Sequence, residues 1–250
     1  VTFSPRLPTI RSAWVMVRLI GCTVTALGSA SCSLPPICRL KSEAPLYDAI
    51  DEGRPRVVIA GFGRVGQIVG RMLRARRIPF IALENSVEQV ALSRKFGNLI
   101  YFGDPSRLEV LQSAHIAQAE LLVIAADDPE TNLRIARLAK RHFPHLRVIA
   151  RARNRQHAFR LMDMGVPAIR ETLYSSVELG KMAFIGLGFK QERAEEFARL
   201  FMAHDDGILA EQYLVHDNEA ALMASATQAY KDLEALFDAD RQDSDSPDQA

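Results

Sequence analysis

The sequence predicts an α/β fold: a Rossmann-like, doubly wound parallel sheet of about six strands with a C-terminal helical extension. Three observations predict it. Short apolar runs alternate with helical stretches from Arg54 onward, a glycine turn with G-x-G-x-x-G spacing comes after the first run, and an acid closes the second. Continuous apolar runs are typical of parallel strands, because helices bury both faces of such a sheet. Together these features predict a nucleotide-binding βαβ unit.

Six strands are expected after the turn at Gly53-Arg54-Pro55. They are Arg56–Ala60, Phe80–Leu83, Leu99–Phe102, Leu121–Ala125, Arg147–Ala150 and Ala168–Arg170. Helical patterns separate them, at Val65–Ala75, Ser86–Phe96, Leu108–Ala114, Glu130–Arg141 and Arg155–Met164. Right-handed crossovers between successive strands then give a doubly wound sheet.

Strand signals stop after Thr172, and the rest of the chain has helical periodicity. Helices are expected at Ser175–Ile185, Gln191–Phe201 and Glu219–Phe237, with breaks at Gly186–Gly188 and around His204–Gly207. The last helix carries an apolar stripe of Leu222, Met223, Ala226, Tyr230, Leu233 and Phe237. Such a stripe is typical of a core face or a dimer seam.

Length and composition fit one large domain with extensions. The 250 residues carry a formal net charge of +1, so no global field favours nucleic acid. All three cysteines (Cys22, Cys32 and Cys38) lie in the first forty residues, which excludes a disulfide framework or cysteine metal site from the rest. We expect an atypical N-terminal segment (1–53), a Rossmann-like nucleotide-binding regulatory domain (54–172), a helical dimerisation extension (173–237) and a disordered acidic tail (238–250).

The first 45 residues differ in character from the rest of the chain. Ala13–Cys32 is largely apolar and comes after two arginines, which is typical of a secretory signal or a short membrane segment. Arg18 near its middle argues against a spanning helix, and the nucleotide-binding pattern behind it argues against export. Because the chain opens with Val1, we interpret this segment as a fragment edge or a misassigned start.

The glycine turn has the residues that phosphate binding requires. Gly61 allows the tight turn, Gly63 lets the backbone approach a phosphate, and Gly66 lets the helix sit close to the strand. The next helix, Val65–Ala75, offers its free N–H groups and positive dipole end to that phosphate. Arg64 adds a charge-assisted contact. The alternative is a turn with no ligand.

Acidic residues come after the second, third and fourth strands, where open α/β sheets bind ligands. Glu84 stands where a carboxylate accepts hydrogen bonds from ribose hydroxyls and repels a 2′-phosphate, which disfavours NADP; a free surface glutamate is the alternative. Asp104 is expected to meet the adenine amino group. Asp127-Asp128 can line the site or cap the next helix, and both interpretations stay open. The full set of predicted nucleotide-binding residues is Gly61, Gly63, Arg64, Val65, Gly66, Glu84, Asn85, Gly103, Asp104, Ala126 and Asp127.

A catalytic constellation is not evident. A dehydrogenase needs a substrate domain and a proton donor beside the nicotinamide, whereas the C-terminal part is short and helical and its histidines, His204 and His216, stand in no catalytic pattern. No metal-ligand spacing occurs. An arginine cluster near the fifth and sixth strands fits a small acidic ligand or a salt-bridged edge. Its members are Arg147, Arg151, Arg153, Arg155 and Arg170.

A family resemblance rests on several collinear motifs. They are VVIAGFGRVGQ, RKFG, YFGDPSRLEVLQSA, ADDPETN, HFPHLRVIARAR and RET. With them, the chain from about Arg54 to Thr172, and more weakly to about Leu214, resembles the cytoplasmic regulatory (RCK/KTN, TrkA-N-like) domain of glutathione-regulated, Kef-type potassium efflux systems.

The resemblance implies a homodimer beneath a cation–proton antiporter-like membrane domain, at the cytoplasmic face of the bacterial inner membrane. It implies AMP or NAD(H) in the glycine-loop site, and glutathione or its adducts as regulatory ligands at the dimer interface. Glutathione contacts would fall on Arg71, Arg170 and Asp205, where some relatives have asparagine at the last position. Phe96 would be the aromatic that a bulky adduct displaces; a core residue at a helix end is the alternative.

We therefore expect a ligand-sensing regulatory module with no enzymatic activity of its own. Residues 1–45 do not supply a polytopic membrane domain, so the chain is expected to be a C-terminal fragment or a detached subunit. The alternative function is a soluble NAD(H)-dependent oxidoreductase. A fragment without activity is a third interpretation.

Overall fold

Six parallel strands form one sheet within the described part of the computed structural model, which comprises residues 48, 50, 54–97 and 99–244. The strands are β1 (Val57–Ala60), β2 (Phe80–Glu84), β3 (Ile100–Phe102), β4 (Leu121–Ile124), β5 (Arg147–Ala152) and β6 (Ala168–Arg170). Their spatial order is β3-β2-β1-β4-β5-β6, so the chain starts in the middle and reverses direction after β3. This doubly wound order confirms the predicted fold class. The interpretation of residues 1–45 lies outside the described residues.

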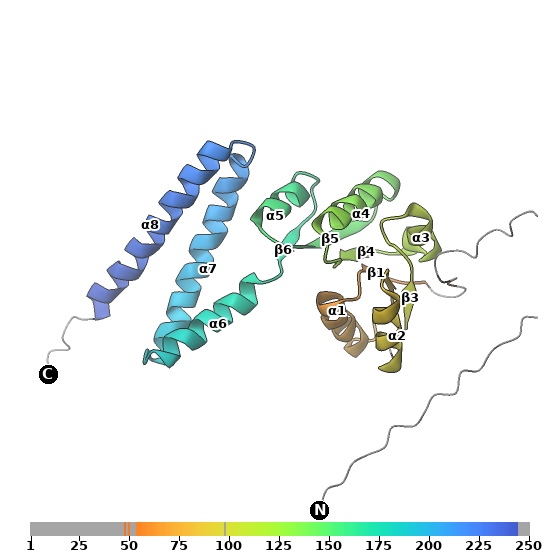
Figure 1. Ribbon diagram of the computed structural model, residues 1–250, viewed down its shortest axis with the longest axis horizontal. Helices are drawn as coiled ribbons and strands as arrows, with labels where there is room; N and C mark the ends of the chain where they lie inside the picture. The colour runs from red at the N-terminus through yellow and green to blue at the C-terminus, as the bar shows by residue number, and fades with distance from the viewer. Residues whose placement is uncertain (1–47, 49, 51–53, 98, 245–250) are drawn as a thin grey trace, which may run out of the picture. The chain divides into compact units, whose positions relative to one another are not determined.

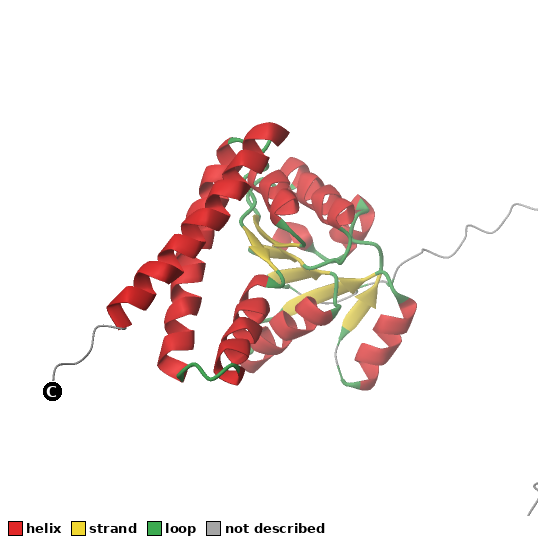
Figure 2. Cartoon of the chain, turned by 60° about the vertical axis from the view of Figure 1, so that its left-hand side comes forward, coloured by secondary structure: helices red, strands yellow, loops and turns green. Residues whose placement is uncertain are grey.

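Helices cover both faces of the sheet (Figures 1 and 2). One face holds α1 (Arg64–Ala75) and α2 (Val87–Lys95), which connect β1, β2 and β3. The other face holds α3 (Leu108–Ser113), α4 (Pro129–His142) and α5 (Arg155–Met162). A short 3₁₀ turn, η1 (Ile116–Gln118), precedes β4 and was not predicted from the sequence. Because the order reverses after β3, right-handed crossovers move the later helices to the second face.

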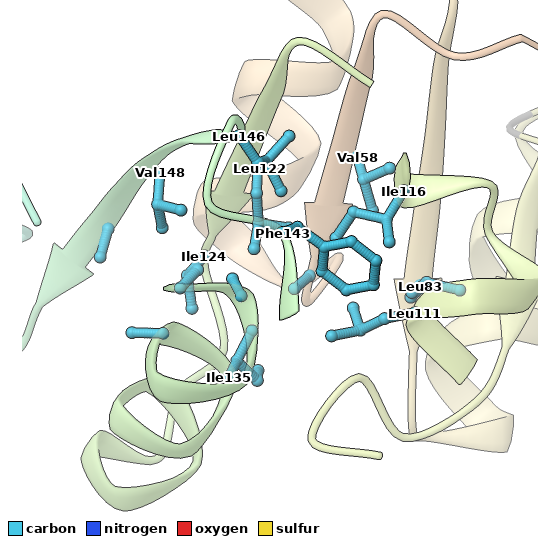
Figure 3. Packing of buried hydrophobic residues seen from close by; sticks show 14 of the residues in the cluster. Val58, Leu83, Leu111, Ile116, Leu122, Ile124, Ile135, Phe143, Leu146 and Val148 are labelled. Atoms are coloured by element: carbon cyan, nitrogen blue, oxygen red, sulfur yellow. The ribbon is translucent and has the colours of Figure 1, made fainter. Parts of the chain in front are cut away.

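Side chains alternate along the strands and so build two cores. In β1, Val58 and Ala60 face the larger core, whereas Val57 and Ile59 face the smaller one beneath α1 and α2. Both faces are therefore apolar, which explains the continuous apolar runs of the sequence. Figure 3 shows residues of the larger core between the sheet and the helices of the second face: Val58, Leu83, Leu111, Ile116, Leu122, Ile124, Ile135, Phe143, Leu146 and Val148.

Three helices come after β6: α6 (Leu173–Gly186), α7 (Gln191–Leu214) and α8 (Glu219–Ser244). The break predicted around His204–Gly207 is wrong, because α7 continues through it. Four of its buried residues recur three to eight positions apart on one face, namely Phe197, Asp205, Ile208 and Gln212. Packing of this face against the sheet-bearing part stabilises the helix more than one glycine weakens it.

The end of α8 also differs from the prediction. We expected the helix to end at Phe237, but it continues to Ser244, and no glycine or proline interrupts residues 238–244. The ring of Phe237 packs against that of Phe197 with centroids 5.0 Å apart, so this end of the apolar stripe contacts α7. Within the described residues, no helix has both the length and the apolar character that a membrane crossing needs.

Candidate nucleotide-binding site

A cleft of about 320 Å³ lies where β1, β2 and β4 end, at the point where the strand order reverses. Open α/β sheets bind ligands at this kind of position. Of the predicted residues, the cleft brings together Gly61, Gly63, Glu84, Asn85, Ala126 and Asp127. Asp128, for which the sequence left a ligand role and a cap role open, also lines it. The lining residues that were not predicted from the sequence are Ser86, Gln89, Pro105, Ala125 and Thr131.

Each of the three glycines in the loop has a different structural reason to be glycine. Gly61 has φ of +96°, and a Cβ there would lie 2.6 Å from the Ala126 nitrogen, so the β1 and β4 ends touch only without a side chain. A Cβ on Gly66 would lie 2.1 Å from the carbonyl oxygen of Gly61, which permits the close contact of helix and loop. Gly63 faces open space, with no atom within 4 Å of a built Cβ. Only Gly63 is therefore free for backbone approach by a ligand.

The N-terminus of α1 faces this open position. Gly63 is its N-cap, and no side chain accepts a hydrogen bond from the first turn. Free N–H groups and the positive end of the helix dipole favour an anion here. Arg64, the first residue of α1, is exposed. The loop can thus hold a phosphate by backbone groups and one cation.

Glu84 is buried and ties the loop to the end of β2. Its Oε2 accepts a hydrogen bond from the Phe62 N–H at 2.7 Å, and its Oε1 accepts from the Ser86 N–H at 3.0 Å. The alternative of a free surface glutamate is therefore wrong. Each carboxylate oxygen has a further lone pair, so Glu84 can still accept a hydrogen bond from a hydroxyl in the cleft.

The two aspartates after β4 have separate roles, which the sequence left open. Asp128 is the N-cap of α4 and accepts from the Thr131 N–H at 2.8 Å and the Thr131 hydroxyl at 2.7 Å. These hydrogen bonds hold the pKa of Asp128 below its usual value. Asp127 accepts from Arg151 Nη1 at 2.5 Å, and both aspartates line the cleft.

Other predicted nucleotide ligands lie near the cleft but do not line it. They are Arg64, Val65, Gly66, Gly103 and Asp104. Asp104 Oδ1 accepts from the Ser106 N–H at 2.9 Å and so stabilises the turn after β3. Gly103 is buried, and its N–H donates to the Glu84 carbonyl at 3.0 Å. The second carboxylate oxygen of Asp104 can still accept from a ligand amine.

A second polar cluster joins the sheet to α7. Asp205, with a side chain 6 % exposed, accepts hydrogen bonds from both Arg155 and Arg170. Arg155 also donates to Gln212 Oε1 at 2.7 Å. Burial alone would raise the pKa of Asp205, but the Arg170 hydrogen bond and the two guanidinium charges hold it below its usual value. Two of the three predicted glutathione contacts, Arg170 and Asp205, therefore pair with each other.

The other predicted regulatory residues lie on helices of the opposite sheet face. Arg71 is exposed on α1 and, within the described part of the chain, has no hydrogen bond or ion pair. Phe96, the C-cap of α2, is 75 % exposed. Its alternative assignment as a core residue is wrong. Exposed side chains of this kind are available to a ligand or a second chain.

The arginine cluster is less basic than its composition indicates. Arg151 is buried, with 6 % of its side chain exposed, and pairs with Asp127 and Glu171. Arg155 and Arg170 pair with Asp205, so three of the five arginines of the cluster are in ion pairs. Arg147 and Arg153 remain exposed. A salt-bridged edge is thus the better description of the members near β6.

Among the described residues, no group of three or more histidine, cysteine, aspartate or glutamate side chains is placed to hold a metal ion. His216 contacts the carbonyl of Tyr213 through Nδ1 at 2.6 Å and Asp163 Oδ2 through Nε2 at 3.2 Å. Its ring stacks on that of Tyr213. His204 buries an Nε2 atom that has no hydrogen-bond partner in this part of the chain. The His216 contacts link the end of α7 to α5.

Two family models match the chain in succession. The TrkA-N domain matches residues 57–170, and the potassium efflux system KefB C-terminal domain matches residues 175–250. The first match ends with β6, and the second begins at Ser175, in the first turn of α6.

Curated relatives and a solved structure give the same result. The glutathione-regulated potassium-efflux system protein KefC of Salmonella arizonae is 41% identical over 196 residues, covering 78% of this chain and 31% of that protein. KefC of Escherichia coli is 38% identical over 201 residues, covering 80% of this chain and 32% of that protein. The structure of the Shewanella denitrificans Kef CTD in AMP-bound form is 39% identical with a TM-score of 0.58, covering 64% of this chain and 98% of that one. The chain thus spans about a third of the length of the curated relatives it matches.

Proposed function

Because the chain belongs to the family of Kef C-terminal domains, we propose that it is the ligand-sensing regulatory domain of a glutathione-gated potassium efflux system. In this proposal the cleft at the glycine loop holds an adenine nucleotide, AMP or NAD(H), without turning it over. Glutathione or its adducts bind at a second site and control potassium–proton exchange by a membrane domain.

The observation that carries the nucleotide assignment is the open Gly63 position beside the anchored Glu84. A 5′-phosphate at Gly63 would accept hydrogen bonds from the uncapped first turn of α1. Glu84 would then accept from a ribose hydroxyl, and Asp104 from the adenine amino group. The proposed nucleotide ligands are Gly61, Gly63, Arg64, Val65, Gly66, Glu84, Asn85, Gly103, Asp104, Ala126 and Asp127.

The proposed glutathione site uses Arg71, Arg170 and Asp205, with Phe96 as the gating aromatic. Glutathione carries two carboxylates and one ammonium group, so arginine forks and an aspartate match its charges. Asp205 already holds Arg170, so a ligand carboxylate must share or replace that pair. We therefore expect weaker glutathione binding than an uncharged residue at position 205 would allow.

The proposed assembly is a homodimer, with glutathione at its interface and a cation–proton antiporter-like domain in the membrane. The regulatory domain would then lie at the cytoplasmic face of the bacterial inner membrane. Exposed apolar side chains on α1, such as Ile68 and Met72 beside Arg71, are compatible with burial against a second copy. In this proposal the membrane partner lies outside the 31% of the Salmonella arizonae KefC that this chain matches.

Thermal unfolding with and without ligands tests the proposal. AMP should raise the melting temperature of the purified chain, and millimolar glutathione should raise it further; Arg170→Ala should lose only the glutathione increment. If glutathione leaves the melting temperature of nucleotide-loaded wild-type chain unchanged, the gating assignment fails. Steady consumption of NADH with a carbonyl or quinone acceptor would instead support an NAD(H)-dependent oxidoreductase.

A further inference from the structure

Charge is distributed unevenly along this nearly neutral chain. Residues 54–172 contain twenty lysines and arginines but ten aspartates and glutamates, whereas residues 173–250 contain six against sixteen. Such asymmetry between parts of one chain is typical of proteins that bind an anionic surface. The excess positive charge therefore belongs to the part that carries the sheet.

Much of this positive charge is exposed where the strands of the sheet begin. The C-terminal end of α1 leads into β2 and that of α4 leads into β5, so both turns lie at this edge, opposite the nucleotide cleft. The segment before β1 also ends here. We call the exposed basic residues of these segments the amino-edge surface: Arg54, Arg56, Arg74, Arg76, Arg77, Lys140, Arg141, His142, His145 and Arg147.

The amino-edge surface surrounds a hollow of about 660 Å³, which Arg56, Lys140, His145 and Arg147 help to line. Among its described lining residues, Glu120 is the single acid, and Arg56 holds both its oxygens at 2.7 and 2.9 Å. The pKa of Glu120 lies below its usual value, mainly because of the hydrogen bond from Arg56. The charge of Arg147 lowers it further. The surface therefore retains a large excess of cations.

The acidic helical extension does not neutralise these cations through its described ion pairs. Asp205 of α7 pairs with Arg155 and Arg170, which stand where β5 and β6 end. The Lys140 Nζ donates to the Gly165 carbonyl at 3.0 Å, a backbone contact that leaves its charge uncompensated. Anionic groups from outside the chain can thus reach the amino-edge surface while the cleft on the opposite edge is occupied.

We infer that the amino-edge surface binds the anionic headgroups of a phospholipid membrane. Clusters of basic side chains next to a membrane attract anionic lipids over roughly one Debye length. Leu99, 77 % exposed just before β3, adds an apolar side chain at the same edge, which suits the interface of a bilayer more than a nucleic acid backbone. Polypeptide that leads from a membrane domain into the sheet would enter it at the start of β1. The start of β1 lies on this same edge, so the amino-edge surface would be near the membrane.

Vesicle co-sedimentation of the full chain tests the inference. One set of vesicles contains phosphatidylcholine alone, and in the other phosphatidylglycerol replaces about half of it. The test variant combines Arg76→Gln, Arg141→Gln and Arg147→Gln. The matched control combines Arg107→Gln, Arg134→Gln and Arg199→Gln, which removes the same charge from exposed positions outside the amino-edge surface.

Wild-type and control chains should partition to the anionic vesicles, and 1 M salt should release both. At about 1 kcal/mol per basic residue, the test variant should partition on the order of a hundredfold more weakly. Equal partition of wild type to both vesicle types, or equal loss in test and control variants, would overturn the inference. If the test variant does not fold, the salt and lipid dependence of the wild type still decides.

A duplex DNA of mixed sequence is titrated in parallel. DNA binding that the test variant loses, without vesicle binding by the wild type, would assign the surface to nucleic acid and overturn the membrane inference. The choice of occupant rests on the proposed role next to a membrane transporter. The vesicle assay needs neither nucleotide nor glutathione, so its failure is distinguishable from a failure of the thermal unfolding tests.

Discussion

The carboxylate of Glu84, at the end of β2, accepts a 2.7 Å hydrogen bond from the N–H of Phe62 in the glycine loop. The same side chain accepts from Ser86, the N-cap of α2. One buried acid thus fixes the loop, the strand end and the start of the next helix in one geometry. Binding-site residues held in this way need little reorganisation when a ligand arrives.

Glu84→Gln should destabilise the chain and weaken nucleotide binding. The amide group of glutamine brings an N–H₂ donor towards one of two backbone N–H donors, so one buried hydrogen bond is lost. Leaving that donor unsatisfied costs about 1–3 kcal/mol in the free energy of unfolding. Denaturant titration and AMP titration measure the two effects, with Glu88→Gln on the exposed face of α2 as control. Unchanged unfolding of the Glu84 variant would contradict this role.

Adding one methyl group to Gly66 or to Gly63 should have different consequences for stability. At Gly66 the new Cβ would lie 2.1 Å from the Gly61 carbonyl oxygen, so the free energy of unfolding should fall by about 1–3 kcal/mol or more. At Gly63 the space is open and φ is −73°, so alanine should unfold much like wild type. Chemical denaturation compares them. Equal stability of both variants would show that the loop differs from this geometry.

Asp205→Asn should lower stability and strengthen glutathione binding. Asparagine is a weaker acceptor for two arginines, so the free energy of unfolding should fall by roughly 1.5–3 kcal/mol. It also frees the charge of Arg170 for a ligand carboxylate. Calorimetric titration of glutathione measures the gain, with Asp206→Asn on the exposed side of α7 as control. Weaker glutathione binding than wild type would contradict this prediction and would mean that the ligand depends on the Asp205 charge more than on the release of Arg170.

His216 should make the docking of α7 on α5 depend on pH. Both ring nitrogens face acceptors, and the Tyr213 carbonyl followed by Asp163 raises the pKa of His216 above its ordinary 6.5. Because the folded-state pKa is the higher one, His216 contributes its full stabilisation below its unfolded-state pKa. That contribution is lost as the pH rises through its folded-state pKa. His216→Gln should therefore lower the melting temperature more at about pH 6 than at about pH 8. A deficit that is equal at both values would refute the ion pair.

The strands and the glycine turn could be predicted from the sequence because their causes are local. An apolar run such as Leu121–Ile124, and a turn in which Gly61 leaves no room for a side chain, can be recognised without knowledge of tertiary contacts. The continuity of α7 could not be predicted. Gly207 is a weak helix former, and Asp205 gains its partners from residues 35 and 50 positions away in the sequence. Tertiary ion pairs of this length leave no periodic signal.

Some residues that line the cleft could not be predicted from the sequence. Gln89 and Thr131 reach it from helices, and neither belongs to a recognised spacing. Asp128 had two interpretations, helix cap and ligand; the Thr131 hydrogen bonds show the cap, and the residue also lines the cleft. Charge composition misled in one respect, because Arg151 is buried between Asp127 and Glu171 rather than free for a ligand.

Calorimetric titration of AMP into the purified chain, and into the Gly63→Trp variant, tests nucleotide binding at the glycine loop without any other ligand. A tryptophan side chain would fill the open space at Gly63, which no neighbouring atom occupies. We predict saturable binding of one AMP per wild-type chain and its loss in a variant that keeps its helical circular dichroism. Equal affinity for both chains, or no binding to the wild type, would show that the cleft is not a nucleotide site.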